Sequence, residues 1–195
     1  FIFICNPATR HIEYVKKCIH YKFRNIFVEK PLSANLNEAK KFMSNYSFKA
    51  HKVFVGYVLS FNHIFIKALE LLNKKKLGKI ISANIVCNSN FKKWRKSREF
   101  SKSVSAKKNL GGGVLNELSH ELSYAVKLFG PIDKVFSKLS NKDNFKINVE
   151  TEAKIICITK KDVNLAIFLD FMNKKEERYC RIIGTKGNLL LDFKN

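Results

Sequence analysis

The sequence lacks the features that mark several classes of protein. It contains no stretch near the roughly 18 consecutive apolar residues of a membrane span, and no charged start followed by an apolar segment and a cleavage site. We therefore expect a cytoplasmic protein without a membrane partner. The five cysteines are widely spaced and form no C-x-x-C pair, so neither a disulfide framework nor a metal site is expected. A hydrophobic content of 46% over 195 residues is ample for a buried core, which excludes a disordered chain.

Acidic residues are scarce, because 16 Asp and Glu stand against 37 Lys and Arg and give a formal net charge of +21. A surface this basic is typical of nucleic-acid-binding proteins. The lysines are nevertheless spread over the whole chain, and no zinc-finger, basic-zipper or RNA-recognition pattern is present. Asn, Ile and Phe share AT-rich codons with Lys, so mutational bias explains the composition. A basic nucleic-acid-binding module, with steeply salt-dependent binding, is kept as the weaker alternative.

A strand, a helix and a second strand are predicted within the first 30 residues. The apolar run 1–5, closed by Asn6-Pro7, is typical of a parallel strand buried on both faces. Thr9 is a plausible cap for an amphipathic helix that extends to His20, and residues 26–28 form the next strand. This order is a βαβ unit with a right-handed crossover. A helix capped by Asn35 or Asn37 is expected to extend to about Tyr46. A strand at 52–57 and a helix at 64–73 are expected to follow.

The pattern changes after Lys79, where we place a domain boundary. Residues 80–87 are β-rich, and a helix is predicted from Gly111-Gly112-Gly113 to Phe129, ended by Gly130-Pro131. The remainder alternates in short strands separated by turns, which favours a largely antiparallel sheet with a helix on one face. Those strands are expected at 135–139, 153–159, 164–171, 179–183 and 189–193.

A charged pair follows directly after the second predicted strand. Glu29, Lys30 and Pro31 stand at the carboxyl end of that strand, the edge where ligands bind in open parallel sheets. A lysine at this edge is suited to give or accept a proton, and Pro31 fixes the backbone beside it. The same tripeptide is common on protein surfaces, so its place after a buried strand is what favours a function.

A second polar group lies on the helix that follows the three glycines. Its members recur at helical spacing and are expected to share one face: Glu117, His120, Glu121 and Tyr124. Glycines let a backbone approach a ligand closely, and His is well suited to move a proton near neutral pH. The alternative is a loop-to-helix junction with a solvated polar face. A third candidate is Trp94 next to Arg95, which suits a sugar or phosphate ligand and equally an exposed basic loop.

A series of short motifs runs in order along nearly the whole chain. They are Ile2 to Pro7 with His11, Val28 to Leu32, Val55 to Tyr57 with Phe61, Leu77 to Ile80, Trp94-Arg95, Ser105 to Lys108, Gly111 to Leu115, Leu118 to Leu122, and Leu128 to Gly130. Each motif alone is weak. Their order and spacing resemble the Gfo/Idh/MocA family of nicotinamide-dependent oxidoreductases.

The resemblance implies an α/β and α+β fold in two parts. Residues 1–78 are expected to be the C-terminal part of a Rossmann-like parallel sheet that binds NAD or NADP. Residues 79–195 are expected to form a substrate-binding domain whose mixed, largely antiparallel open sheet also suits contact with a second copy. The family's G-x-G-x-x-G fingerprint is absent. The chain is therefore expected to start about two βα units late, on the order of 60 residues, and to end early, so that alone it is inactive.

The resemblance also implies the site residues. Lys30 resembles the family lysine that lies between the nicotinamide and the substrate hydroxyl. His120 resembles the family's acid or base, and Glu117 falls where an aspartate is usual. The implied catalytic residues are thus Lys30, His120 and Glu117; the implied cofactor contacts are Asn6, Pro7, His11, Glu29 and Lys30; and the implied substrate contacts are Lys30, Tyr57, Trp94, Arg95 and His120.

The expected function is hydride transfer between NAD(P) and a hydroxyl-bearing carbon of a sugar or sugar-derived metabolite. Glu117 and His120 are three residues apart rather than the four of many members, as in a subgroup that looks tied to surface-carbohydrate biosynthesis. Ser60, Asn62 and Ser123 also depart from residues common in the family, which points to a different specificity. A catalytically inactive truncated relative is the main alternative. The sequence leaves open which of Lys30 and His120 is the base.

Overall fold

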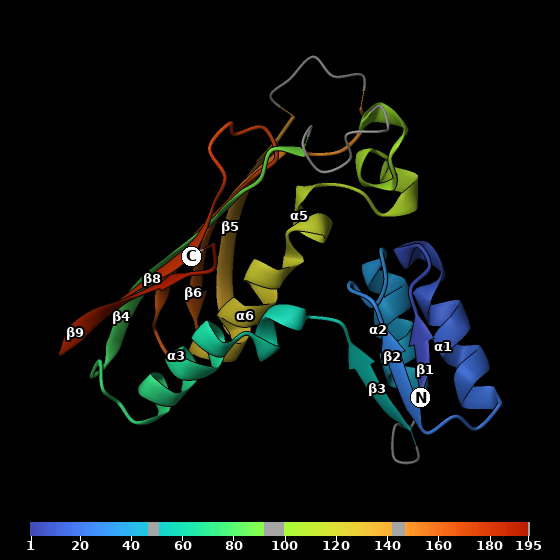
Figure 1. Cartoon of the computed structure of the whole chain (residues 1–195), viewed down its shortest axis with the longest axis horizontal. Coiled ribbons are helices and arrows are strands. Elements are labelled where there is room, and N and C mark those ends of the chain that lie inside the picture. The colour runs from blue at the N-terminus through green and yellow to red at the C-terminus, as the bar shows by residue number, and fades with distance from the viewer. Residues whose placement is uncertain (47–50, 92–99, 142–146, 195) are drawn as a thin grey trace.

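The computed structural model describes residues 1–46, 51–91, 100–141 and 147–194. They form two sheets, a three-stranded one near the N-terminus and a six-stranded one built by the remainder (Figure 1). No helix in these residues is long and apolar enough to cross a membrane. The expected fold class, a parallel α/β part followed by a mixed open sheet with helices, is confirmed.

The small sheet is parallel and has its helices on one face. Its strands β1 (Ile2–Ile4), β2 (Asn25–Val28) and β3 (Lys52–Val55) pair in chain order. The helices α1 (His11–His20) and α2 (Leu36–Asn45) cover the same face, since both contribute to one core. Their core includes Ile12, Val15 and Phe42, packed against alternate strand residues such as Ile26. The βαβ unit predicted for the first 30 residues is confirmed.

The large sheet is mixed, with order β5-β6-β7-β4-β8-β9. β4 pairs in parallel with β7, and all other neighbours are antiparallel. A two-residue turn, Thr185-Lys186, joins β8 to β9 between Gly184 and Gly187. The strands are β4 (Ile80–Asn88), β5 (Ile132–Ser140), β6 (Glu152–Thr159), β7 (Asn164–Asp170), β8 (Glu177–Gly184) and β9 (Gly187–Asp192).

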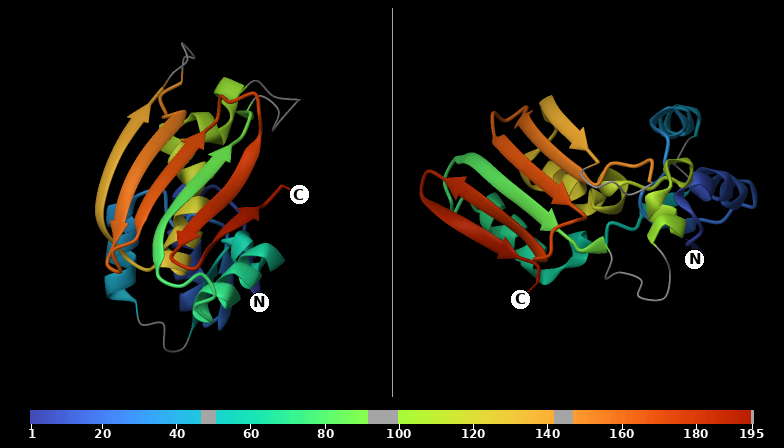
Figure 2. Two further views of the ribbon diagram at one scale, coloured as in Figure 1. Left: turned by 90° about the vertical axis from the view of Figure 1, so that its left-hand side faces the viewer. Right: turned by 90° about the horizontal axis from the view of Figure 1, so that it is seen from above.

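Helices cover one face of the large sheet and leave the other open (Figure 2). The covering helices are α3 (His63–Asn73), α5 (Val114–Glu117) and α6 (Ser119–Phe129). Short 3-10 turns complete the fold: η1 (Ala8–Arg10), η2 (Val58–Phe61), η3 (Phe100–Lys102), η4 (Val104–Ala106) and η5 (Lys108–Leu110). The α3 residues Phe65 and Ala68 belong to the core of the large sheet, together with Leu77. This packing favours a boundary before α3 rather than the one expected between residues 78 and 79.

One expected element is wrong. A continuous helix was predicted over residues 114–129, but the backbone breaks at Leu118, with φ −97° and ψ 31°, into α5 and α6. An unbroken helix would use the carbonyls of Asn116 and Glu117 to bond the amides four residues on. The break releases these carbonyls for another partner, which lies across the cleft between the two sheets.

Candidate functional site

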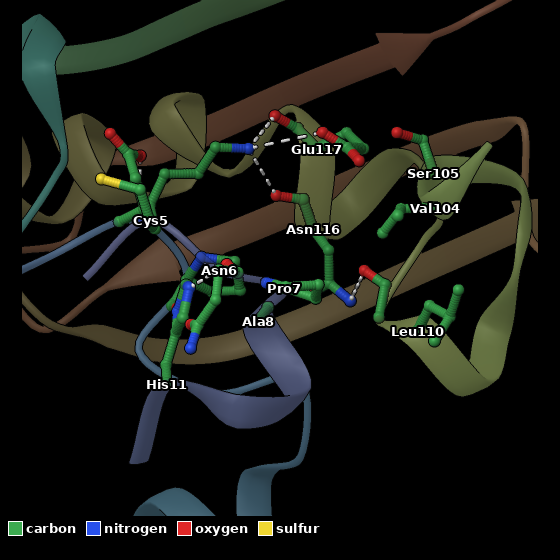
Figure 3. Close-up of a pocket in the computed structure, with 14 residues that line it drawn as sticks. Cys5, Asn6, Pro7, Ala8, His11, Val104, Ser105, Leu110, Asn116 and Glu117 are labelled. Carbon is green, nitrogen blue, oxygen red and sulfur yellow. Dashed lines mark hydrogen bonds and ion pairs between the residues drawn. The ribbon is translucent and has the colours of Figure 1, made fainter. Parts of the chain in front are cut away.

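The ends of two parallel strands and a segment from the other half of the chain enclose a cavity of about 330 Å³. The loop after β1 and the loop after β2 form one side, and residues between η4 and the end of α5 form the other (Figure 3). This is the sheet edge where ligands were expected. The lining residues are Cys5, Asn6, Pro7, Ala8, His11, Glu29, Lys30, Pro31, Val104, Ser105, Leu110, Gly111, Asn116 and Glu117.

The side chain of Lys30 extends from the loop after β2 to the carbonyl groups at the C-terminal end of α5. Its Nζ donates to the carbonyl oxygen of Glu117 at 2.8 Å and to that of Asn116 at 3.2 Å. The Glu117 carboxylate lies 3.6 Å from the same nitrogen, with both side chains mostly shielded from solvent. A cation at the C-terminal end of a helical turn is favourable, because the carbonyls there carry partial negative charge. Lys30 is thus held as a hydrogen-bond donor at the inner wall of the pocket.

The expected polar face of one long helix does not exist, because the break at Leu118 separates its members. Glu117 stays at the pocket on α5, whereas Glu121 and Tyr124 on α6 point into the protein and are buried. His120 is half-buried and its ring centroid lies 5.7 Å from that of Tyr57, edge to face. The structure therefore brings Glu117 to Lys30 and brings His120 to Tyr57, a predicted substrate contact.

The environment of His120 keeps its ring neutral. Burial, followed by the positive charges of Arg178 and Lys30, lowers the pKa of His120 to about 4. Its Nδ1 is buried and has no hydrogen-bond partner among the described residues. A neutral imidazole at pH 7 presents a lone pair that can accept a proton.

A buried ion pair behind His120 was not predicted from the sequence. Arg178 on β8 donates from Nε to Glu121 Oε1 at 2.7 Å and from Nη2 to Oε2 at 3.2 Å. Glu121 is 0% exposed and the Arg178 side chain is 26% exposed, so this pair joins α6 to the sheet at the edge of the core. Its partners are 57 residues apart in the chain. No local pattern marks such a pair, since only the packing of helix on sheet brings its members together.

Two of the three glycines, Gly112 and Gly113, serve the protein's own packing, whereas Gly111 lines the cavity. A Cβ on Gly112 would lie 2.4 Å from the Ser105 carbonyl oxygen. Gly113 has φ +110°, and a Cβ there would lie 2.4 Å from the Glu150 carboxylate. Glu150 in turn accepts from the Leu115 amide at 3.2 Å. At Gly112 and Gly113 the expected approach of a ligand is thus replaced by a close junction that fixes α5, and for Gly111 it stays a prediction.

His11 lies at the cavity, but its two ring nitrogens face main-chain carbonyls, Nδ1 to Pro31 and Nε2 to Asn6. No polar atom of the ring is left for a cofactor. Asn6 has a buried Oδ1 without a partner among the described residues. Trp94 and Arg95 lie outside the described residues. Asn116 was missed by the sequence analysis, because it acts through a backbone carbonyl that any residue type would provide.

Comparisons with known proteins agree with this architecture. The model of an oxidoreductase family with an NAD-binding Rossmann fold, GFO_IDH_MocA, matches residues 1–57, and that of the GFO/IDH/MocA C-terminal domain matches residues 65–190. Oxidoreductase P35 of Formosa agariphila is 24% identical over 98% of this chain and 59% of its own length.

Two solved structures share the fold. Levoglucosan dehydrogenase, in complex with NADH and levoglucosan, superposes with a TM-score of 0.88 and 17% identity over 100% of this chain and 54% of its own. The WlbA dehydrogenase of Bordetella pertussis, in complex with NADH and UDP-GlcNAcA, superposes with a TM-score of 0.83. It is 16% identical, and the match covers 96% of this chain and 54% of its own. The chain thus spans little more than half the length of these relatives.

Proposed function

Because the chain belongs to the GFO/IDH/MocA family of NAD-binding oxidoreductases, we propose that it forms the nicotinamide and substrate side of a sugar dehydrogenase. The reaction is hydride transfer between NAD or NADP and a hydroxyl-bearing carbon of a sugar or sugar-derived metabolite. The observation that carries the proposal is Lys30, held as a donor at the junction of the two sheets near a neutral His120.

The residues of the cavity fit the nicotinamide end of the cofactor. Its volume of about 330 Å³ lies at the lower end of the roughly 300–1,000 Å³ of small-molecule sites. The buried and unpartnered Oδ1 of Asn6 is an acceptor that a carboxamide or a ribose hydroxyl would satisfy. Pro7, Glu29 and Lys30 complete the proposed cofactor contacts. Nothing in these residues resembles a glycine-rich phosphate loop, so the fit concerns this end alone.

The proposed chemistry divides the roles between two side chains. When bound, the oxidised cofactor would supply the hydride acceptor. The Lys30 ammonium donates a hydrogen bond to the substrate hydroxyl oxygen, and Glu117 orients that ammonium through its carbonyl and carboxylate. His120 takes the hydroxyl proton, so the alcohol becomes a carbonyl as the C–H electron pair leaves with the hydride. Its lowered pKa keeps the ring without a proton at pH 7, and this is the form that can accept one.

Sugar-type substrates are favoured by the neighbours that were solved with levoglucosan and with UDP-GlcNAcA. The departures at Ser60, Asn62 and Ser123 leave the sugar itself open. We propose Tyr57 as one substrate contact, because its ring lies against that of His120. Trp94 and Arg95 stay candidates from the sequence.

The test is an assay of the full-length protein that includes this chain, with a panel of sugars and both cofactors. Replacing Lys30 by Met should lower kcat/KM by about a hundredfold to ten-thousandfold, because a positioned proton donor is removed. The matched control is Lys40→Met, an exposed lysine on α2. Equal activity of Lys30→Met and the control would contradict the assignment. Absence of activity in the wild type on every sugar would favour the inactive relative.

A further inference from the structure

The buried histidine at the cavity stands between two hydrogen-bond acceptors. His11 is 1% exposed and lies in the first turn of α1. Its Nδ1 is 2.7 Å from the carbonyl oxygen of Pro31, and its Nε2 is 2.8 Å from the carbonyl oxygen of Asn6. The first oxygen belongs to the loop after β2 and the second to the loop after β1. One imidazole ring therefore joins the two loops that form one wall of the pocket (Figure 3).

The chemistry of the two partners limits the protonation state of the ring. A carbonyl oxygen only accepts hydrogen bonds, whereas a neutral imidazole donates from one nitrogen and presents a lone pair on the other. In either neutral tautomer, one lone pair would face a carbonyl oxygen at hydrogen-bonding distance, which is repulsive. Only a ring with a proton on both nitrogens satisfies both contacts. We propose that His11 is a doubly protonated, cationic clamp that fastens the two loops of the cofactor pocket.

The surroundings make a buried cation tolerable. Two charge-assisted hydrogen bonds replace the water that the ring loses, and such bonds are stronger than neutral ones. The Glu29 carboxylate lines the same cavity and accepts from the Lys30 amide at 3.2 Å. The Lys30 ammonium carries the same sign of charge as a protonated His11, but it donates to the α5 carbonyls across the cleft. On α1 itself, Arg10 and Glu13 pair with each other at the surface.

The clamp depends on both protons of the ring. If the ring loses one proton, one of the two bonds is lost and the loops are joined by a single contact. This inference concerns the free protein and does not depend on the proposed dehydrogenase activity. His11 is thus a positioning residue for the pocket.

The experiment is NMR of the imidazole nitrogens in the chain labelled with nitrogen-15. Spectra are recorded at about one pH unit above the ordinary histidine value of about 6.5. His11 is expected to show two protonated nitrogens that couple to ring protons in the same way. His120, whose pKa is lowered to about 4, should show one protonated and one bare nitrogen. A bare nitrogen on His11 under these conditions would overturn the proposal.

The assignment does not require a variant of the clamp itself. The other four histidines, His20, His51, His63 and His120, are replaced by Gln one at a time, and the signal present in all four proteins is that of His11. His51 is a useful comparison, because its Nδ1 meets a single carbonyl, that of Phe23 at 2.8 Å, which a neutral ring satisfies.

Discussion

The two sheets contribute to the site in different ways. The three-stranded sheet offers residues that directly follow its strands, such as Asn6 after β1 and Lys30 after β2. Among the described residues, no strand of the six-stranded sheet lines the pocket, and its half acts through η4, η5 and α5. Glu150 fixes α5 by accepting from the Leu115 amide, and Arg178 fixes the following helix, α6, by donating to Glu121. The strand order of the small sheet therefore positions its pocket residues. The pocket residues of the other half are positioned by side-chain contacts between residues distant in the chain.

The largest expected effect is the loss of the buried ion pair in the second half. Arg178→Met leaves the Glu121 carboxylate buried without its partner, which should destabilise the chain by about 3–5 kcal/mol. The matched change in the first half is Glu13→Gln, which removes an exposed partner of Arg10 and Lys17. It should have no measurable effect, because surface pairs are solvated and screened.

Urea unfolding followed by circular dichroism compares the two variants, together with a double variant, Glu121→Leu with Arg178→Met. The double change should recover part of the loss, because no uncompensated charge remains in the core. Equal stability of Arg178→Met and the wild type would show that this contact does not hold α6 on the sheet.

The second prediction concerns the proton affinity of His120. Arg178 is one cause of its lowered pKa, so the Arg178→Met variant should raise that pKa from about 4 toward the ordinary value. Because the folded-state pKa is depressed, the neutral ring favours folding above about pH 6.5. That contribution is lost as pH falls toward about 4. NMR titration of the ring protons measures the shift, with the exposed His20 of the first half as the internal reference. An unchanged His120 titration in the variant would contradict an electrostatic role for Arg178.

The smallest expected effect concerns the open faces of the two sheets. On the large sheet, one exposed row crosses all six strands in register: Phe136, Ile156, Ala166, Asn84, Arg181 and Leu190. On the small sheet, a shorter row consists of Phe3, Phe27 and Phe54. We propose, as expected from the sequence, that a second copy of the chain contacts the exposed row of the large sheet.

Sedimentation at several concentrations separates these faces. A lysine in place of Ile156 should shift the chain toward the monomer, because it places a charge inside the contact. Phe54→Lys should leave the association state as it is in the wild type. If Phe54→Lys and not the Ile156 variant shifts the chain toward the monomer, the contact lies on the small sheet. If neither the wild type nor the variants associate, the proposed contact is wrong.

Much of the fold was predictable because local chemistry decides it. The run 1–5 with Asn6-Pro7 predicted β1 and its end, but the expected burial on both faces is wrong, since Phe3 is 67% exposed. Of the two caps expected for α2, Asn35 is the one found, and it accepts from the Glu38 amide at 3.0 Å. Hydrophobic period and turn residues placed all five strands after residue 130 within a few residues. The break at Leu118 was not predictable, since the segment carries a good helical pattern. The break accompanies contacts from Lys30, which donates to carbonyls that a continuous helix would use, 86 and 87 residues away in the chain.

The sequence by itself determined which residues stand at the ligand edge of the small sheet, because strand order and the loops after parallel strands follow from local pattern. It also contained the motifs that identify the family. Only the tertiary structure decided that Lys30 is held by backbone carbonyls, that His120 stays neutral and that His11 is enclosed by two acceptors. These properties arise from burial and from contacts between residues far apart in the chain. Such contacts leave no trace in the spacing of residue types, since backbone atoms are common to every residue.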